Sequence, residues 1–388
     1  MTTTNFISSL DHPIRLGICA MEDKVKNSIH PFINQLTLLR STPMKVFIQK
    51  IQKFQDIQIN IFTSKNIESP IEDWPICDAF LCFYSQGFPI DKAISYCDLR
   101  KPYEVNNLKT QKLLTNRKKV YQVLEKHNIP TPKKIFSTCC DHSSEFIEHD
   151  DYIECKGERI YKPFVEKPFD AEDHNICIYY PMSQGGGCRK LFRKVGDNSS
   201  CFDPNLNSIR RDGSYVYEEF VELDDAKDVK VYSTPAMAYA ELRKSPSVDG
   251  HVERNNLGRE MRTVTLLSDE ETSLSLRINN AFNQFVCGFD ILRTNGVSYV
   301  CDVNGWSMVK GTNQDKFYEE SGKLLGQLLQ SVFSQATTPD IRITNQPILP
   351  TPSLSSSSNT IFSYIGNHAP SKFHTNNLKP FCTKLPSR

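Results

Sequence analysis

The sequence Val300-Cys301-Asp302-Val303-Asn304-Gly305-Trp306-Ser307 begins as a strand in which apolar and polar residues alternate. A second apolar segment, Phe285 to Arg293, precedes it. Between the two lies Asn295-Gly296, the strongest short turn signal in the chain, because both residues accept the positive φ angles of a type I′ turn. We therefore predict a β-hairpin, with strands over residues 285–293 and 297–303.

Three oxygen-bearing side chains of this hairpin are expected to converge. Asp302 and Asn304 lie two residues apart and so share one face of their strand, and Asp290 can lie opposite them on the partner strand. Two carboxylates and an amide oxygen suit Mg²⁺, which prefers oxygen ligands and completes its shell with water and phosphate oxygens. Polar residues that simply face water would give the same pattern, so the hairpin alone leaves both interpretations open.

The overall composition is typical of a globular protein of a reducing compartment. The 388 residues are enough for two or three domains, and the net charge of +1 provides no field that attracts nucleic acid or membrane. The thirteen cysteines show no C-x-x-C pair and no zinc-ligand spacing, which favours free thiols. We find no signal peptide and no segment of roughly 20 apolar residues. We therefore expect a soluble cytosolic protein, or a nuclear one, with no membrane or nucleic-acid partner.

The order of the expected elements divides the chain into four parts. Short apolar strands alternate with helices up to residue 106, which is typical of a parallel α/β layer. A helix is expected over residues 108–127, followed by a β-rich segment and a helix from Ser268 to Val286, where Ser268 and Glu271 form a capping box. An amphipathic helix is expected over residues 315–333. The expected parts are an N-terminal tail (1–13), an α/β domain (14–106), a mixed α/β and α+β domain (107–334) and a disordered Ser- and Pro-rich tail (335–388).

The β-rich segment holds three features that are typical of a nucleotide site. Lys167 lies at a strand end, where its ammonium group can meet phosphate oxygens. The backbone N–H groups of Gly185 to Gly187 could cover phosphates, although three glycines are more often only a turn. Glu218 to Val221 end an apolar strand whose backbone could pair with an adenine base.

Basic residues then recur in pairs, and they are separated from the acids. The acidic residues gather between Glu218 and Asp228, and the basic residues lie on either side. A charge run is usually a solvated face, but this separation suits a site with a metal–nucleotide half and a polyanion half. We find no recognition helix or interleaved aromatic residues of the kind that nucleic-acid binding requires. The basic residues are Arg189-Lys190, Arg193-Lys194, Arg210-Arg211, Arg243-Lys244, Arg254, Arg259 and Arg262.

A series of short motifs occurs in order from about Arg15 to about Leu329. Besides the hairpin, the series comprises Glu166-Lys167-Pro168, Ala171 to Asn175, Tyr179-Tyr180-Pro181, Gly185 to Gly187, Leu191 to Lys194, Tyr217 to Phe220, Asp228 to Tyr232, Arg243 to Pro246 and Asp249-Gly250. The series resembles the kinase domain of the diphosphoinositol pentakisphosphate kinases, and the resemblance covers that domain only.

The resemblance implies an ATP-grasp fold, in which two β-rich subdomains hold ATP behind an α/β pre-domain. It also implies a Mg²⁺-dependent kinase with ATP as co-substrate. The γ-phosphoryl group would pass to a phosphate of inositol hexakisphosphate, or of its 5-diphospho derivative, at the 1-position. An acceptor phosphate is already ionised, so such catalysis needs no strong general base and depends on positioning and charge neutralisation.

The resemblance further implies roles for individual residues. ATP contacts fall on Arg117, Lys167, His174, Glu218, Glu219, Phe220, Val221, Asp228 and Lys230. Magnesium ligands fall on Asp290, Asp302 and Asn304. Inositol phosphate contacts fall on Lys24, Arg193, Lys194, Arg254, Arg262 and Ser307. The expected catalytic residues among these are Lys230, Arg262 and Asp302.

The chain departs from the family pattern on the substrate side. The family has adjacent lysines after its first strand, where this chain has Met21 to Lys26 at the start of a longer loop. Tyr84 and Gln86 stand where the family has histidine and lysine. Both departures remove positive charge, so we expect them to affect capture of the inositol phosphate rather than binding of ATP.

Two other functions stay open at this stage. An ATP-grasp carboxylate–amine ligase would share the fold, but a small carboxylate needs fewer cations than this sequence offers. A non-catalytic polyphosphate sensor would have no need of a complete set such as Lys167, Lys230 and Asp302. Neither oligomeric state nor the preference between the two inositol substrates follows from the sequence.

Overall fold

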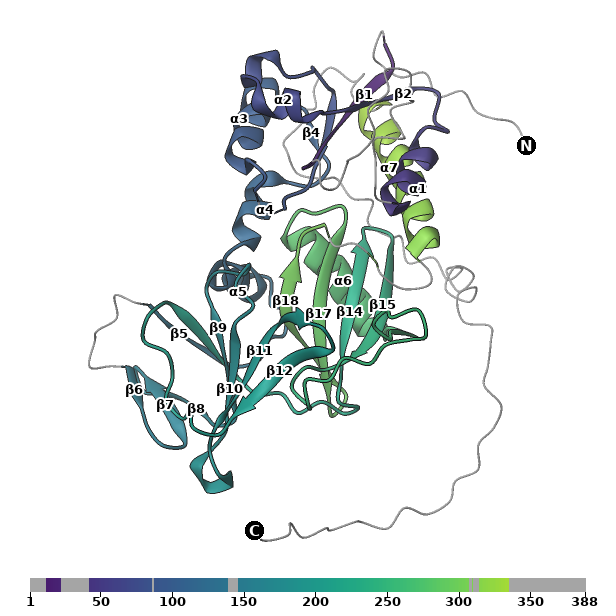
Figure 1. Cartoon of the computed structure of the whole chain (residues 1–388). Helices are drawn as coiled ribbons and strands as arrows, with labels where there is room; N and C mark the ends of the chain where they lie inside the picture. Colours follow the sequence, from purple (N-terminus) through teal and green to yellow (C-terminus); the bar gives the residue numbers. More distant parts are fainter. Residues whose placement is uncertain are drawn as a thin grey trace, which may run out of the picture. The chain divides into compact units, whose positions relative to one another are not determined.

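The computed structural model describes residues 12–21, 42–85, 87–138, 146–306, 309 and 314–334. All of these residues belong to the first of two units, which covers residues 1–347 (Figure 1). Three sheets position the features discussed below, and a small fourth sheet adjoins them. None of the described helices is both long and apolar enough to cross a bilayer.

The first sheet is parallel, with strand order β2-β1-β3-β4. Every residue of β3 and nearly every residue of β1 is buried, which explains their continuous apolar sequences. The α/β layer expected near the N-terminus is therefore confirmed. Its elements are β1 (Ile14–Cys19), α1 (Thr42–Ile51), β2 (Ile57–Ile61), α2 (Ser64–Glu68), β3 (Ala79–Cys82), α3 (Ile90–Arg100) and β4 (Tyr103–Glu104).

The last described helix, α7 (Gln314–Ser334), packs into the core of this first sheet. Its contact with α1 and with the turn after α1 is close, because one glycine faces each of them. A methyl group at Gly322 would lie 2.5 Å from the carbonyl oxygen of Phe47, and one at Gly326 would lie 2.3 Å from the ring of Phe54. The predicted helix over residues 315–333 is confirmed. Its buried face contributes Phe317, Tyr318, Leu325 and Leu329 to the N-terminal core.

The second sheet is antiparallel, with strand order β12-β11-β10-β9-β13-β5. Aromatic side chains such as Phe164, Tyr179 and Tyr217 fill the core beneath it. Its strands are β5 (Lys134–Ser137), β9 (Phe164–Pro168), β10 (Ile176–Tyr179), β11 (Cys188–Val195), β12 (Asn198–Asp203) and β13 (Tyr215–Glu219). The small adjoining sheet comprises β6 (Phe146–Glu148), β7 (Tyr152–Cys155) and β8 (Glu158–Tyr161).

The third sheet is also antiparallel, with strand order β16-β15-β14-β17-β18 (Figure 1). The helix α6 (Asp269–Ala281) packs on this sheet. Its residues Leu274 and Ile278 belong to the same hydrophobic core as Phe289 on β17. Its N-terminus carries the predicted capping box between Ser268 and Glu271. The strands are β14 (Lys227–Thr234), β15 (Met237–Lys244), β16 (Thr263–Thr265), β17 (Cys287–Thr294) and β18 (Val297–Asn304).

The hairpin predicted from the sequence is confirmed as β17 and β18. Asn295 and Gly296 connect the strands with φ angles of 49° and 75°, the positive values that a type I′ turn requires. A β-bulge between Asp290 and Ile291 shifts the register between the two strands.

Two of the predicted helices have the wrong extent. The single helix expected over residues 108–127 is two helices, α4 (Leu108–Leu114) and α5 (Arg117–Lys126). The break occurs because Asn116 caps α5, accepting a hydrogen bond of 3.1 Å from the backbone N–H of Lys119. The helix expected from residue 268 to 286 ends at Ala281, since the next five residues lead into β17.

We predict that Gly322→Ala lowers the free energy of unfolding by about 1–3 kcal/mol, because the new methyl group meets backbone that cannot move cheaply. The higher helix propensity of alanine offsets this loss only in part. Gln327→Ala, at an exposed position of the same helix, should change stability by less than about 0.5 kcal/mol. Denaturant unfolding of both variants provides the measurement. Equal stabilities would show that α7 and α1 do not pack as closely as described.

Candidate functional site

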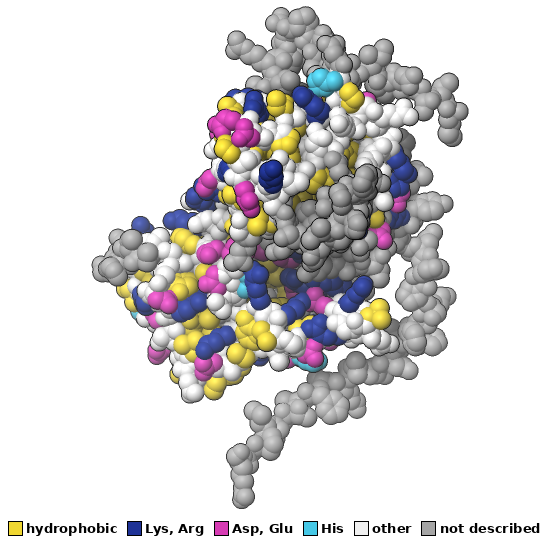
Figure 2. All heavy atoms as spheres, turned by 45° about the horizontal axis from the view of Figure 1, so that its top comes forward, with side chains coloured by type: hydrophobic (Ala, Val, Ile, Leu, Met, Phe, Trp, Pro, Cys, Tyr) yellow, Lys and Arg dark blue, Asp and Glu magenta, His cyan; other side chains and the backbone are white. Residues whose placement is uncertain are grey.

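Both antiparallel sheets contribute residues to one large cavity of about 880 Å³. Figure 2 shows a face of the molecule on which Lys and Arg side chains gather beside Asp and Glu side chains. Most of the predicted site residues line the cavity. These are Arg117, Lys167, His174, Arg193, Lys194, Glu218, Glu219, Phe220, Val221, Asp228, Lys230, Arg262, Asp290, Asp302 and Asn304.

A few predicted residues are not in this group. Arg254 does not line the cavity. Its guanidinium group pairs with Asp197 and donates a hydrogen bond of 2.9 Å to the carbonyl oxygen of Gly258. Lys24, Gln86 and Ser307 lie outside the described residues, as does most of the loop after Met21.

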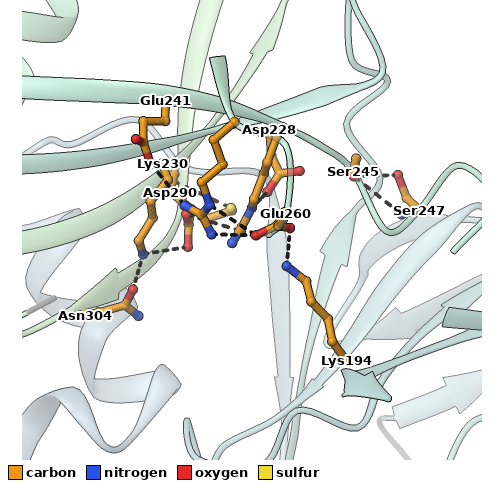
Figure 3. Close-up of polar contacts among 12 residues, drawn as sticks. Lys194, Asp228, Lys230, Glu241, Ser245, Ser247, Glu260, Asp290 and Asn304 are labelled. Carbon is orange, nitrogen blue, oxygen red and sulfur yellow. Dashed lines mark hydrogen bonds and ion pairs between the residues drawn. The ribbon is translucent and has the colours of Figure 1, made fainter. Parts of the chain in front are cut away.

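The centre of the cavity wall is built by strand register. Asp290 on β17 pairs with Lys230 on β14 at one side and with Asp302 on β18 at the other. The Lys230 ammonium group lies 3.1 Å from Asp290 Oδ2 and also donates to Asn304 Oδ1 (Figure 3). Asn304 Nδ2 donates to Asp302 Oδ2 over 2.7 Å. The structure therefore brings together the three oxygen-bearing side chains that the sequence predicted to converge.

The donor set has the chemistry of a divalent cation site. Oxygens of Asp290 and Asn304 already hold a positive group, the ammonium of Lys230. The described residues contain no group of three Asp, Glu, His or Cys side chains that could hold a metal. A Mg²⁺ ion here would therefore depend on the Asn304 amide and on oxygens from water or a ligand, as Mg²⁺ commonly does.

Nearby cations keep the carboxyl group of Asp302 ionised. Burial alone would raise the pKa of Asp302. The positive charges of Arg117, Lys230 and Lys167 outweigh burial and lower that pKa below its ordinary value. The site thus combines a partly buried negative charge with several positive groups around it.

Lys167 is held at the boundary between the two sheets. Its ammonium group lies 2.7 Å from Glu218 Oε2 and donates over 3.0 Å to the carbonyl oxygen of Cys301 on β18. Glu218, only 2% exposed, also accepts a hydrogen bond of 2.5 Å from Tyr121. These contacts link the six-stranded sheet to the hairpin through polar groups, in addition to the hydrophobic core that Val216 of the sheet shares with Val300 of the hairpin.

The predicted phosphate contacts Arg117 and His174 have partners within the chain. Arg117 is buried and donates to the carbonyl oxygens of Pro168 and Asp170 over 2.8 and 2.7 Å. His174 is exposed, and its Nδ1 lies 2.8 Å from the carbonyl oxygen of Glu172. Arg117 thus supports the loop that leads from β9 towards His174.

The strand edge predicted to pair with adenine is partly occupied. The N–H of Glu219 donates over 2.8 Å to the carbonyl oxygen of Lys133, and that of Phe220 over 3.3 Å to Pro163. A base at this edge would therefore use Val221 or the carbonyl groups.

The sequence left the glycine-rich loop open between a phosphate cover and a turn, and the structure favours the turn. Gly185, Gly186 and Gly187 do not line the cavity. Their N–H groups donate to Met182, Pro181 and Asn207. All three glycines have positive φ angles, so they form a turn.

Arg243 is a cavity residue to which the sequence gave no role. It pairs with Asp228 across β14 and β15, and its guanidinium group lies 2.6 Å from Asp228 Oδ2 and 3.4 Å from Asp290 Oδ1. The Arg243-Lys244 pair was visible in the sequence, but only the strand register shows which of the two faces the carboxylates. The other cavity residues without a predicted role include Lys244, Ser245, Ser247, Glu260 and Trp306.

The cations predicted to hold a polyanion are paired with acids. Arg193 lies 3.3 Å from Glu172, and Lys194 pairs with Glu260 (Figure 3). Arg262 lies 2.8 Å from Glu260 and 3.3 Å from Glu241. This half of the cavity therefore carries its own anions among its cations.

Two family models match this chain. Residues 14–116 match the diphosphoinositol pentakisphosphate kinase 2 N-terminal domain, and residues 199–328 match a RimK-like ATP-grasp domain. The inositol hexakisphosphate and diphosphoinositol-pentakisphosphate kinase VIP1 of Arabidopsis thaliana is 44% identical over 351 residues, which is 88% of this chain. Over this length the chain is similar to the diphosphoinositol pentakisphosphate kinases. The resemblance seen in the sequence and the predicted ATP-grasp fold are both confirmed.

Other relatives match the chain at a similar sequence identity and over a similar length. Inositol hexakisphosphate and diphosphoinositol-pentakisphosphate kinase 2 of Homo sapiens is 44% identical over 82% of this chain, and the Saccharomyces cerevisiae kinase is 41% identical over 88%. The chain spans 25% to 31% of the length of these relatives. A D-alanine–D-alanine ligase from Bacillus anthracis covers 83% of this chain, and this chain covers 98% of that structure, with a TM-score of 0.47 and 14% identity.

We predict that Glu218→Gln lowers the free energy of unfolding by on the order of 3 kcal/mol, because it leaves the buried ammonium group of Lys167 without its carboxylate. The matched control is Glu219→Gln, which changes the exposed neighbour and should have little effect. Thermal and denaturant unfolding measure both variants. Similar stabilities for the two would contradict the described pairing of Glu218 with Lys167.

Proposed function

We propose that this chain is the kinase domain of an inositol pyrophosphate kinase. It transfers the γ-phosphoryl group of ATP to the 1-phosphate of inositol hexakisphosphate or of its 5-diphospho derivative, which forms a pyrophosphate. The observation that supports this proposal is a single cavity that is lined both by a carboxylate–ammonium cluster and by a group of Lys and Arg side chains. The relatives that match the chain are named as kinases of these two compounds.

Within this proposal, ATP lies on the side of the cavity that contains Lys167 and Lys230. Arg117, His174 and Lys167 bind its phosphates together with Lys230, and the strand edge from Glu218 to Val221 receives the adenine. Asp228 faces the ribose. Lys230 is well placed to change partners, since it shares its ammonium group between Asp290 and Asn304.

Asp290, Asp302 and Asn304 would hold Mg²⁺ in this proposal. The bound ion would neutralise negative charge on the transferred phosphoryl group. The Asp302 carboxyl group, whose pKa is lowered by its cationic neighbours, is ionised at neutral pH and needs no proton removed before it binds a cation.

The acceptor lies on the opposite side, next to Arg193, Lys194 and Arg262. Arg254, Lys24 and Ser307 belong to the same proposed group of inositol phosphate contacts. The acceptor oxygen is already ionised, so these residues act by binding and orienting it in line with the γ-phosphorus rather than by removing a proton. Tyr84, where the family has a histidine, also lines the cavity but brings no positive charge.

We further propose that residues 14–106 act as the pre-domain and residues 107–334 as the kinase domain. The tail expected after residue 334 lies outside the described residues. Because α7 packs into the N-terminal core, the two parts share one hydrophobic core and do not fold independently. The ten cysteines that the structure describes are free thiols, which supports a location in the cytosol or nucleus.

A carboxylate–amine ligase is the second candidate, and the match to a RimK-like ATP-grasp domain is the observation that favours it. The number of cations in the cavity favours the kinase, because each phosphate group needs its own charge partners. Incubation with labelled ATP, Mg²⁺ and a panel of inositol phosphates distinguishes the two, with amine and carboxylate pairs as controls. Label transfer to inositol hexakisphosphate supports the kinase, and amide formation with release of phosphate supports the ligase.

We predict that Asp302→Ala abolishes phosphoryl transfer and leaves the fold intact, since it removes an oxygen ligand from a cavity wall and no core side chain. Chelation of Mg²⁺ should have the same effect on the wild-type protein and should be reversible. Asp150→Ala, at an exposed site in the connection between β6 and β7, is the control for loss of one carboxylate. Turnover is measured with labelled ATP, and folding by circular dichroism. Near-normal turnover of the folded Asp302 variant would refute the proposed metal site.

A further inference from the structure

Glu260 lies between two cations of the cavity and contacts both. One of its carboxylate oxygens accepts from Lys194, and the other lies 2.8 Å from Nη2 and 3.1 Å from Nε of Arg262 (Figure 3). Its side chain is only 17% exposed, and that of Arg262 is 8% exposed. A two-oxygen anion between a lysine and an arginine fork has the binding chemistry of a phosphate group.

These contacts connect the two sheets that line the cavity. Lys194 belongs to β11 of the six-stranded sheet, whereas Glu260 and Arg262 lie on the connection from β15 to β16 of the five-stranded sheet. The backbone of the same connection forms hydrogen bonds with the β11–β12 hairpin. Ser199 N–H donates over 2.7 Å to the Gly250 carbonyl, and Val252 N–H donates over 2.8 Å to Asp197. Met261 N–H in turn donates over 2.8 Å to the Glu253 carbonyl, so the backbone next to Glu260 is tied to this connection.

The charge of Glu260 is maintained by its partners. Burial alone would raise the pKa of Glu260, but the hydrogen bond from Lys194 and the charge of Arg262 outweigh it and lower the pKa. Glu241, which is 1% exposed, also contacts Arg262 over 3.3 Å. Arg262 thus remains compensated by Glu241 when Glu260 leaves, whereas Lys194 becomes available to a new anion.

We propose that Glu260 occupies the place of a substrate phosphate and must be displaced from Lys194 and Arg262 when the inositol polyphosphate binds. This inference depends on the proposed function, because it names the substrate side of that same site. Glu260 is in this sense a specificity-determining residue and not a catalytic one. Its carboxylate belongs to the chain and competes with every incoming anion at the same two cations.

An internal anion of this kind favours ligands that carry several phosphate groups over ligands that carry one. A small anion with one phosphate group gains the two contacts that Glu260 gives up, so its binding brings little net benefit. An inositol polyphosphate also reaches Arg193, whose partner Glu172 is 40% exposed against 17% for Glu260, so the competing ion pair there is weaker. Glu260 therefore discriminates against inorganic phosphate and sulfate more than against the true substrate.

The test is Glu260→Gln, which keeps the shape of the side chain and removes its charge. We expect tighter binding of inositol hexakisphosphate by on the order of tenfold, the equivalent of about 1.4 kcal/mol. Inorganic sulfate should become a competitive inhibitor against the inositol substrate at concentrations where it does not inhibit the wild-type protein. The KM for ATP should stay within about twofold, because Glu260 contacts no residue of the proposed ATP side.

Calorimetry measures the binding of inositol hexakisphosphate. Steady-state kinetics measures the KM for ATP and the inhibition by sulfate, at fixed ionic strength because such contacts are screened by salt. The matched control is Glu154→Gln, which breaks the ion pair with Arg159 on the small adjoining sheet. It should change neither binding nor sulfate inhibition. A melting temperature close to that of the wild-type protein shows that Glu260→Gln is folded, and Glu260→Asp, which keeps the charge, should restore resistance to sulfate.

Two results would overturn the inference and leave the kinase assignment intact. One is unchanged or weaker binding of inositol hexakisphosphate by folded Glu260→Gln, and the other is a fall in kcat with both KM values unchanged, as expected of a residue that only supports the loop. A wild-type protein that binds no inositol phosphate, yet uses ATP to join an amine and a carboxylate, would instead refute the proposed function together with this inference.

Discussion

The site depends on the register of three strands in the five-stranded sheet. Asp290 is paired with Lys230 on one side and with Asp302 on the other. Side chains alternate between the two faces of a strand, so a slip of one residue would move all three groups into the apolar core. The neighbouring residues Val229 and Phe289 are fully buried on the opposite face. The hydrophobic core that fixes the register thus also places the charged groups.

Charge compensation is the second constraint on this cavity. Lys167, Lys194, Arg243 and Arg262 are each paired with a carboxylate of the chain. A buried charge without a partner destabilises a fold strongly, whereas a pair is roughly neutral. A protein that binds a highly charged ligand in a partly buried site therefore needs internal counter-ions whenever the ligand is absent. Glu260 is such a counter-ion at a position where the ligand itself would bring negative charge.

The parts of the structure that the sequence predicted well are those decided by local chemistry. The Asn295-Gly296 turn and the Ser268 cap depend on residues a few positions apart, and both occur as expected. The break at Asn116 was missed although the same kind of signal was present, because the helical pattern on either side continues through it. The glycine loop stayed open between two interpretations, because no local feature shows which acceptors its N–H groups meet.

The features that could not be predicted arise from contacts between distant segments. Arg243 and Glu260 were visible as charges, but their partners Asp290 and Lys194 lie 47 and 66 residues away along the chain. The family resemblance supplied most of the candidate residues. It assigned roles to cations and left out the carboxylates that neutralise them. Pairing within the site therefore had to come from the structure.

Trp306 shows how the hairpin is held against the N-terminal sheet. It follows the strand that carries Asp302 by two residues, and its ring stacks on Phe83 at 5.4 Å and meets Phe47 edge-on at 5.3 Å. Phe47 lies on α1, against which α7 packs through Gly322. The end of the site strand is thus anchored in an aromatic cluster. Because α7 closes that cluster from the far end of the sequence, formation of the site requires both ends of the described chain, although the charged groups themselves come from its middle.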